Sequence, residues 1–158
     1  MKKRRHKIPT AAPSKEEAPM MDTVNGLLEE LERIGWKYRD VQEMEDGKAH
    51  VACDVTGKSA QVTFHFFFDA DSHALSLRVF KLFATPIDKR LQIMERMNAF
   101  NAQFRWIKFF LDQDNWMNLQ SDAVVNGGTS GKICVELMMR SMQIIDQTYP
   151  EFMHEIWA

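Results

Sequence analysis

The sequence predicts an α+β domain with an antiparallel sheet, in the order helix, four strands, helix, two strands, helix. Three observations support this class: short apolar runs come in groups, turn-forming residues separate them, and single helical patterns stand between the groups. The chain has 158 residues and is 45% hydrophobic, which is enough for one core and too little for two ordinary domains. We therefore expect a disordered basic tail over residues 1–20 and a single domain over residues 21–158.

The first helix is expected to begin at Asp22, whose side chain suits an N-cap, and to end at Gly35 as a C-cap. Apolar residues at three- and four-residue spacing lie between them: Val24, Leu27, Leu28, Leu31 and Ile34. Residues 36–43 and 49–55 are expected to form a hairpin, because turn-forming residues separate them and apolar residues alternate in the second run.

Two longer strands are expected over residues 60–68 and 74–83. In the register we expect, Phe68 lies opposite Ala74 and Phe66 lies opposite Ser76. Neither face is then cleanly polar, so the pattern does not say which side of this hairpin meets water.

The second helix is expected to begin at Thr85 as a hydroxyl cap, with Pro86 at the first helical position. Two adjoining apolar stripes follow on this helix: Ile87, Leu91 and Met94 with Asn98, and Ile93, Met97 and Phe100. The last helix carries apolar residues from Cys134 to Ile156 at helical spacing. Pro150 is expected to kink or restart it.

The last hairpin is expected to pair residues 104–111 with residues 116–125, so that Phe109 faces Asn118. One face, with Phe104, Trp106 and Phe110, then forms the main core layer. The other face forms an apolar patch with a polar rim: Arg105, Ile107, Phe109, Leu111, Trp116 and Asp122. Such a patch is typical of a partner or dimer surface. The alternative, that one of the helices covers this face, stays open.

No motif for catalysis, metal binding or a cofactor is complete. The loop over residues 126–132 imitates a phosphate loop, but Asn126 and Ile133 stand where that loop needs glycine and a hydroxyl residue. The Asp-rich turns lack the glycine and the distant glutamate of a calcium loop. The five histidines are scattered. We therefore predict a protein that is not an enzyme and has no metal or cofactor.

The two cysteines, Cys53 and Cys134, lie far apart in apolar patterns and are expected to be free and buried. Free thiols are typical of a reducing compartment, so we predict a cytoplasmic protein. No apolar run approaches the roughly 20 residues that span a bilayer, and no membrane association is expected.

The charge is distributed unevenly. Five positive charges precede Ile8, so the net charge of −2 leaves the rest of the chain at −7. The five are Lys2, Lys3, Arg4, Arg5 and Lys7. An acidic body is repelled by nucleic acid, and only the tail could bind it, weakly. We favour a disordered, solubilising tail.

One set of positions combines two asparagines, an aromatic and basic run and a Tyr-Pro pair: Asn98, Asn101, the run Arg105-Trp106-Ile107-Lys108-Phe109 with the Asp-rich turn after it, and Tyr149-Pro150. At these positions the chain resembles the YbjN-type family of bacterial sensory transduction regulators. The resemblance covers about residues 21–158 in element order. It implies a fold similar to the type III secretion chaperones: a small α+β domain with a curved antiparallel sheet, commonly dimeric and without a known cofactor.

These observations together predict a non-enzymatic bacterial protein that forms a homodimer and binds a protein client, in a chaperone-like or regulatory role. It would bury apolar sheet or helix surface against a segment of the client. The alternative is a sensory regulator that binds a small molecule between the sheet and the helices.

Overall fold

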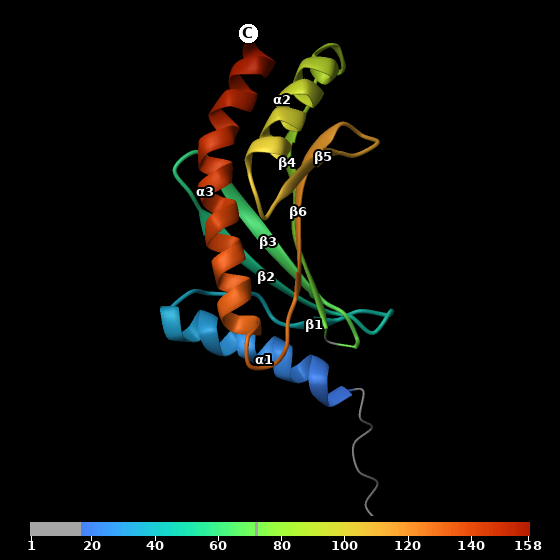
Figure 1. Ribbon diagram of the computed structural model, residues 1–158, viewed down its shortest axis with the longest axis vertical. Helices are drawn as coiled ribbons and strands as arrows, with labels where there is room; N and C mark the ends of the chain where they lie inside the picture. The colour runs from blue at the N-terminus through green and yellow to red at the C-terminus, as the bar shows by residue number, and fades with distance from the viewer. Residues whose placement is uncertain (1–16, 72) are drawn as a thin grey trace, which may run out of the picture.

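The structure, a computed structural model, describes residues 17–71 and 73–158. Within these residues, six antiparallel strands form one sheet, and three α-helices pack against one face of it (Figure 1). The sheet order is β1-β2-β3-β4-β6-β5. The predicted class and order of elements are confirmed. The basic residues of the predicted tail lie outside the described residues.

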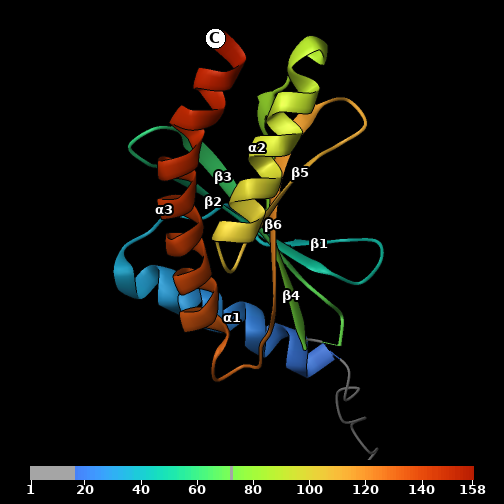
Figure 2. The same ribbon diagram turned by 45° about the horizontal axis from the view of Figure 1, so that its top comes forward.

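The helices are α1 (Glu17–Ile34), α2 (Arg90–Gln103) and α3 (Ser130–Trp157), with a 3-10 turn, η1 (Ile87–Lys89), before α2. The strands are β1 (Gln42–Glu43), β2 (Ala49–Thr56), β3 (Gln61–Phe68), β4 (Ala74–Ala84), β5 (Lys108–Leu111) and β6 (Trp116–Val124). In both views α2 and α3 lie side by side, and α1 crosses the first turns of α3 (Figure 2).

The predicted end of α1 is confirmed, but its predicted start is wrong. The helix begins at Glu17, so Asp22 lies inside it and is not its N-cap. Gly35 ends it as predicted, with a φ of 75° that an L side chain rarely adopts. The Gly35 amide donates to the Glu32 carbonyl at 3.1 Å and the Trp36 amide donates to the Leu31 carbonyl at 2.8 Å. These two bonds are those of a Schellman C-cap.

The start of α2 also differs from the prediction. The Thr85 hydroxyl is buried and caps no helix; the Thr85 amide instead donates to the Asn115 carbonyl at 2.8 Å. Pro86 is the N-cap of η1, and α2 follows this tight turn. The backbone of Thr85 is therefore used to join β4 to the last hairpin.

The pairing of β3 with β4 differs by one residue from the predicted register. Phe68 lies opposite Leu75 and Phe66 lies opposite Leu77. This register places the fully buried apolar residues of both strands on the face that the helices cover: Phe64, Phe66 and Phe68 of β3, and Leu75 and Leu77 of β4. A slip of one residue would send those of one strand to the outer face. Burial of apolar surface therefore selects the register.

An aromatic cluster joins the second half of α3 to the sheet and to α2. The Phe152 ring lies 5.1 Å from the ring of Phe83, 5.1 Å from that of Phe100 and 5.4 Å from that of Phe109, centroid to centroid. Phe152 has no exposed surface. Because these residues come from β4, α2 and β5, one side chain of α3 contacts three other elements.

The helix α3 runs through Pro150 as one segment, so the predicted restart does not occur. Proline has no amide hydrogen to donate to the carbonyl four residues earlier, which is that of Asp146. The Ser59 hydroxyl donates to this carbonyl at 3.0 Å, and the Ser59 amide donates to the Asp146 carboxylate at 2.8 Å. The turn between β2 and β3 thus supplies the bond that proline cannot.

Ser59→Ala is expected to lower the free energy of unfolding by about 1 kcal/mol, because it leaves the Asp146 carbonyl without this donor. In a Pro150→Ala background the amide of residue 150 can donate to that carbonyl, and the loss should shrink. A double-mutant cycle by urea denaturation measures the difference. An equal loss in both backgrounds would contradict the compensation.

Candidate functional site

The register of the last hairpin differs by one residue from the prediction. Phe109 lies opposite Leu119 and Leu111 opposite Met117; the predicted pairing of Phe109 with Asn118 is wrong. The observed register aligns buried Phe109 with buried Leu119 on the covered face. Because side chains alternate between the two faces of a strand, a shift of one residue in the pairing exchanges the buried and the outer face.

The six residues of the predicted interface do not form one exposed patch. Ile107 and Phe109 are buried in the core, which the helices cover. Arg105 is exposed in the loop before β5, and Asp122 forms an ion pair with Arg78 at 2.9 Å instead. Leu111 lies opposite Met117, the residue next to Trp116, and both Leu111 and Trp116 are only half-buried. The predicted pair of Arg105 with Asp122 is therefore wrong.

Asn101, at the end of α2, closes the free edge of β5. Its side-chain carbonyl accepts from the Phe109 amide at 2.8 Å, and its side-chain amide donates to the Phe109 carbonyl at 2.9 Å. The Lys108 ammonium donates to the Asn101 backbone carbonyl at 2.8 Å. These bonds satisfy backbone groups that an edge strand otherwise leaves unpaired. They also hold both ends of the short loop between α2 and β5.

Trp106 lies in this loop and is 55% exposed. Its φ is 75°, in the left-handed region that bulky L residues rarely enter. The next residue, Ile107, is anchored in the core. The backbone turn at Trp106 therefore sends the isoleucine inward while the indole stays at the surface. Strain of this kind persists only where the surroundings hold it, and it is often found at ligand sites.

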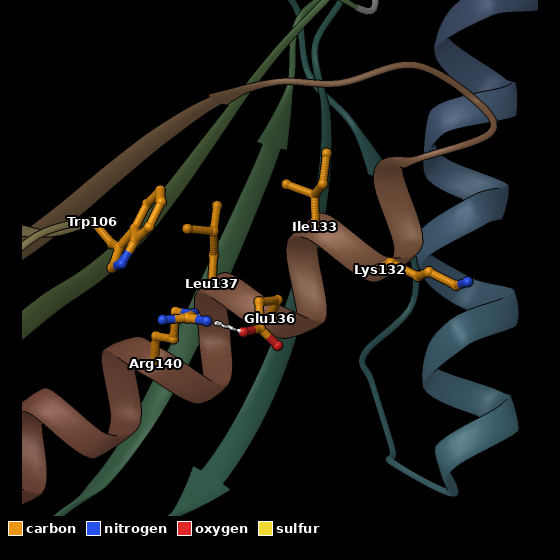
Figure 3. Close-up of a pocket in the computed structure, with 6 residues that line it drawn as sticks. All are labelled: Trp106, Lys132, Ile133, Glu136, Leu137 and Arg140. Atoms are coloured by element: carbon orange, nitrogen blue, oxygen red, sulfur yellow. Dashed lines mark hydrogen bonds and ion pairs between the residues drawn. The ribbon is translucent and has the colours of Figure 1, made fainter.

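A cavity of about 410 Å³ lies between Trp106 and the first half of α3 (Figure 3). We call it the Trp106 pocket. Its lining residues are Trp106, Lys132, Ile133, Glu136, Leu137 and Arg140. Five of these come from successive turns of α3, so one face of the helix forms one wall and the indole forms the other.

Arg140 supplies the positive charge beside the indole. Its guanidinium carbon lies 5.6 Å from the Trp106 ring centroid, which is a cation–π contact. The Arg140 Nε donates to the Glu136 carboxylate at 2.6 Å. Lys132 instead extends toward α1, away from the indole (Figure 3). The pKa of Glu30 on α1 is lowered mainly by its hydrogen bond with Arg33, and Lys132 adds a smaller effect.

The sequence did not predict this site. The expected register placed Trp106 in the core layer, and nothing in a tryptophan predicts a left-handed backbone. One signal was present: Ile133, Leu137 and Arg140 follow at spacings of four and three, so they lie on one helical face.

A second feature lies on the outer face of the sheet. The rings of His50 and His65 are joined by a 2.8 Å hydrogen bond between Nε2 and Nδ1, and the ring of Phe67 stacks 4.8 Å from that of His50. Burial lowers the pKa of both histidines, and the charge of Arg39 lowers it further. Both shifts favour the neutral form of the imidazole. Among the described residues, no group of three or more His, Cys, Asp or Glu side chains could hold a metal.

The two thiols are free and buried, as predicted. Burial raises the pKa of Cys53 to about 11 and that of Cys134 further still. Neither forms the thiolate that a nucleophile requires at neutral pH. Each helix within residues 17–71 and 73–158 is too short or too polar to span a lipid bilayer.

Comparison with known proteins agrees with this fold. Residues 23–154 match the family described as "YbjN: Putative bacterial sensory transduction regulator". A solved structure described as "Crystal structure of YbjN, a putative transcription regulator from E. coli" superposes with a TM-score of 0.53 at 14% sequence identity, over 81% of this chain and 92% of that chain. No curated protein matches. The family match spans most of the chain, and the chain therefore belongs to the YbjN family.

Proposed function

We propose that this chain is a regulatory protein that acts by binding other proteins and not by catalysis, and that it works as a homodimer. The observation that carries the proposal is an exposed apolar surface that begins at η1 and continues along α2. Ile87 is 75% exposed, Leu91 70% and Met94 40%. We call these three residues the α2 stripe.

The α2 stripe is separate from the face that α2 buries. Ile93 and Phe100 pack into the core on the other side of the helix. One buried face is enough to hold a helix on its domain, so a second apolar stripe lowers solubility unless something covers it. A partner protein that binds to the α2 stripe would cover it.

The spacing of the α2 stripe favours a second copy of the chain as its cover. Its members follow at four and three residues, and Asn98 continues the series after four more. This is the spacing of a helix–helix seam, in which a polar residue can set the register. Two copies can bury the same stripe against each other about a two-fold axis, which is the commonest symmetry of protein dimers.

A client protein would then bind on a surface that the dimer leaves open. No helix of residues 17–71 or 73–158 covers the outer face of the sheet, and this face presents the half-exposed ring of Phe80 beside Phe67, 6.2 Å apart. Aromatic groups on an open surface are common in protein interfaces. The family description as a sensory transduction regulator agrees with a role in binding. The free buried thiols agree with the cytoplasm as its location.

Light scattering coupled to size-exclusion chromatography tests the dimer. We expect the mass of two chains for the wild type and of one chain for Leu91→Glu, because a buried unpaired carboxylate opposes association. Val124→Glu is the matched control, since Val124 is an exposed apolar residue at the end of β6; it should remain dimeric. A wild type that stays monomeric at about 100 μM contradicts the proposal. A dimeric Leu91→Glu variant contradicts the surface.

A further inference from the structure

We propose that the Trp106 pocket is a binding site for a small carboxylic acid with an apolar body, such as an aryl or branched alkyl carboxylate. The proposal goes beyond the dimer and does not depend on it, because no residue of the α2 stripe lines the pocket. It follows from the size of the pocket, its walls, its charge and the backbone that holds its tryptophan.

The size and walls of the pocket suit a small apolar body. The volume of about 410 Å³ lies within the range of about 300–1,000 Å³ that is usual for sites of small molecules. The indole of Trp106 offers a flat face, and Ile133 and Leu137 line the opposite wall. A phenyl ring or a branched alkyl group can pack between them.

The charge of the pocket favours an anion. Arg140 is the cation beside the indole, and its guanidinium can hold a carboxylate with two parallel hydrogen bonds. At present its Nε and one terminal nitrogen both contact the same oxygen of Glu136, at 2.6 Å each. The side chains of Arg140 and Glu136 are 48% and 60% exposed. Ion pairs this exposed are weak, so a ligand carboxylate can take the place of Glu136.

The backbone keeps the pocket open without a ligand. The two hydrogen bonds between Asn101 and Phe109 and the burial of Ile107 hold the loop in place. Within this loop, Trp106 is held in its left-handed conformation. The indole is therefore positioned before binding. A site formed in advance loses less conformational entropy when its ligand arrives.

The experiment follows the indole N–H resonance of Trp106 in the full-length protein by ¹⁵N NMR. Trp106→Phe assigns the resonance among those of the four tryptophans. The probe is 3-phenylpropionate, and its neutral amide is the matched control ligand. We expect a saturable shift with a Kd on the order of 1 mM, as is usual for a ligand of this size. The amide should bind at least about tenfold more weakly, since it lacks the charge.

The variants separate recognition from folding. Arg140→Gln should weaken binding of 3-phenylpropionate by about tenfold or more. Glu136→Gln should tighten it severalfold, because it removes the competing carboxylate. Arg33→Gln is the matched control: it removes an exposed arginine that pairs with a carboxylate of its own helix, Glu30 on α1, and should leave the Kd unchanged. All three substitutions alter exposed side chains, and the remaining amide spectrum verifies their fold.

Three results would overturn the proposal. One is no shift of the Trp106 resonance up to about tenfold above the expected Kd. Another is equal affinity for the acid and its amide, or for the wild type and Arg140→Gln. The third is much tighter binding of the tripeptide Gly-Gly-Phe with a free carboxylate, which would assign the pocket to the C-terminus of a peptide.

Discussion

Phe152→Ala is expected to lower the free energy of unfolding by about 3–5 kcal/mol. The ring has no exposed surface and lies within 5.4 Å, centroid to centroid, of the rings of Phe83, Phe100 and Phe109. Its removal leaves a cavity where three elements meet, and the surrounding rings can close it only partly. Urea denaturation followed by circular dichroism measures the change in midpoint at a constant slope.

Trp157→Ala provides the control for Phe152→Ala. It removes a larger aromatic side chain from the last turn of the same helix, but this one is exposed. The change should stay within about 0.5 kcal/mol, as at most surface positions. Similar losses for the two variants would mean that α3 does not pack on the sheet through Phe152.

The sequence predicted the order of elements because that order depends on local signals. The left-handed glycine that ends α1 and the alternation of apolar residues in β2 can both be read within a few residues. The two strand registers could not be read in this way. A difference of one residue in a turn exchanges the faces of a strand, and in β3 and β5 both faces carry aromatic residues. Only the helices on one side of the sheet decide which face is buried.

The same reason explains why the candidate site was missed. Both apolar stripes of α2 were visible in the sequence, but contact with Phe152 selects the one that contains Phe100 as the buried face. In the last hairpin, the corrected register moves Phe109 into the core and leaves Trp106 outside. The pocket then depends on α3, which begins more than twenty residues later in the chain. Tertiary contacts therefore position its parts.

Gly131→Ala is expected to lower the free energy of unfolding by about 2 kcal/mol, although alanine is the better helix former. A Cβ atom at this position would overlap the carbonyl oxygen of Gly26 and lie 2.9 Å from the Cβ of Glu30. Neither atom is at the end of a flexible side chain, so α1 and α3 must separate. The Ser130 hydroxyl donates to the Thr23 carbonyl at 2.7 Å and would move with them. Overpacking of this kind costs about 1–3 kcal/mol.

The sign of this change makes the test decisive. Helix propensity alone favours alanine over glycine by about 1 kcal/mol inside a helix, so a Gly131→Ala variant more stable than the wild type would show that α1 and α3 do not meet there. Gly128→Ala is the control, because the nearest atom to its Cβ is the Asn126 side-chain oxygen at an ordinary 3.5 Å. Its stability should change by less than about 0.5 kcal/mol. A loss of stability at residue 131 without a loss at residue 128 therefore locates the crossing of α1 and α3 at Gly26 and Gly131. A side chain at either position would push the two backbones apart.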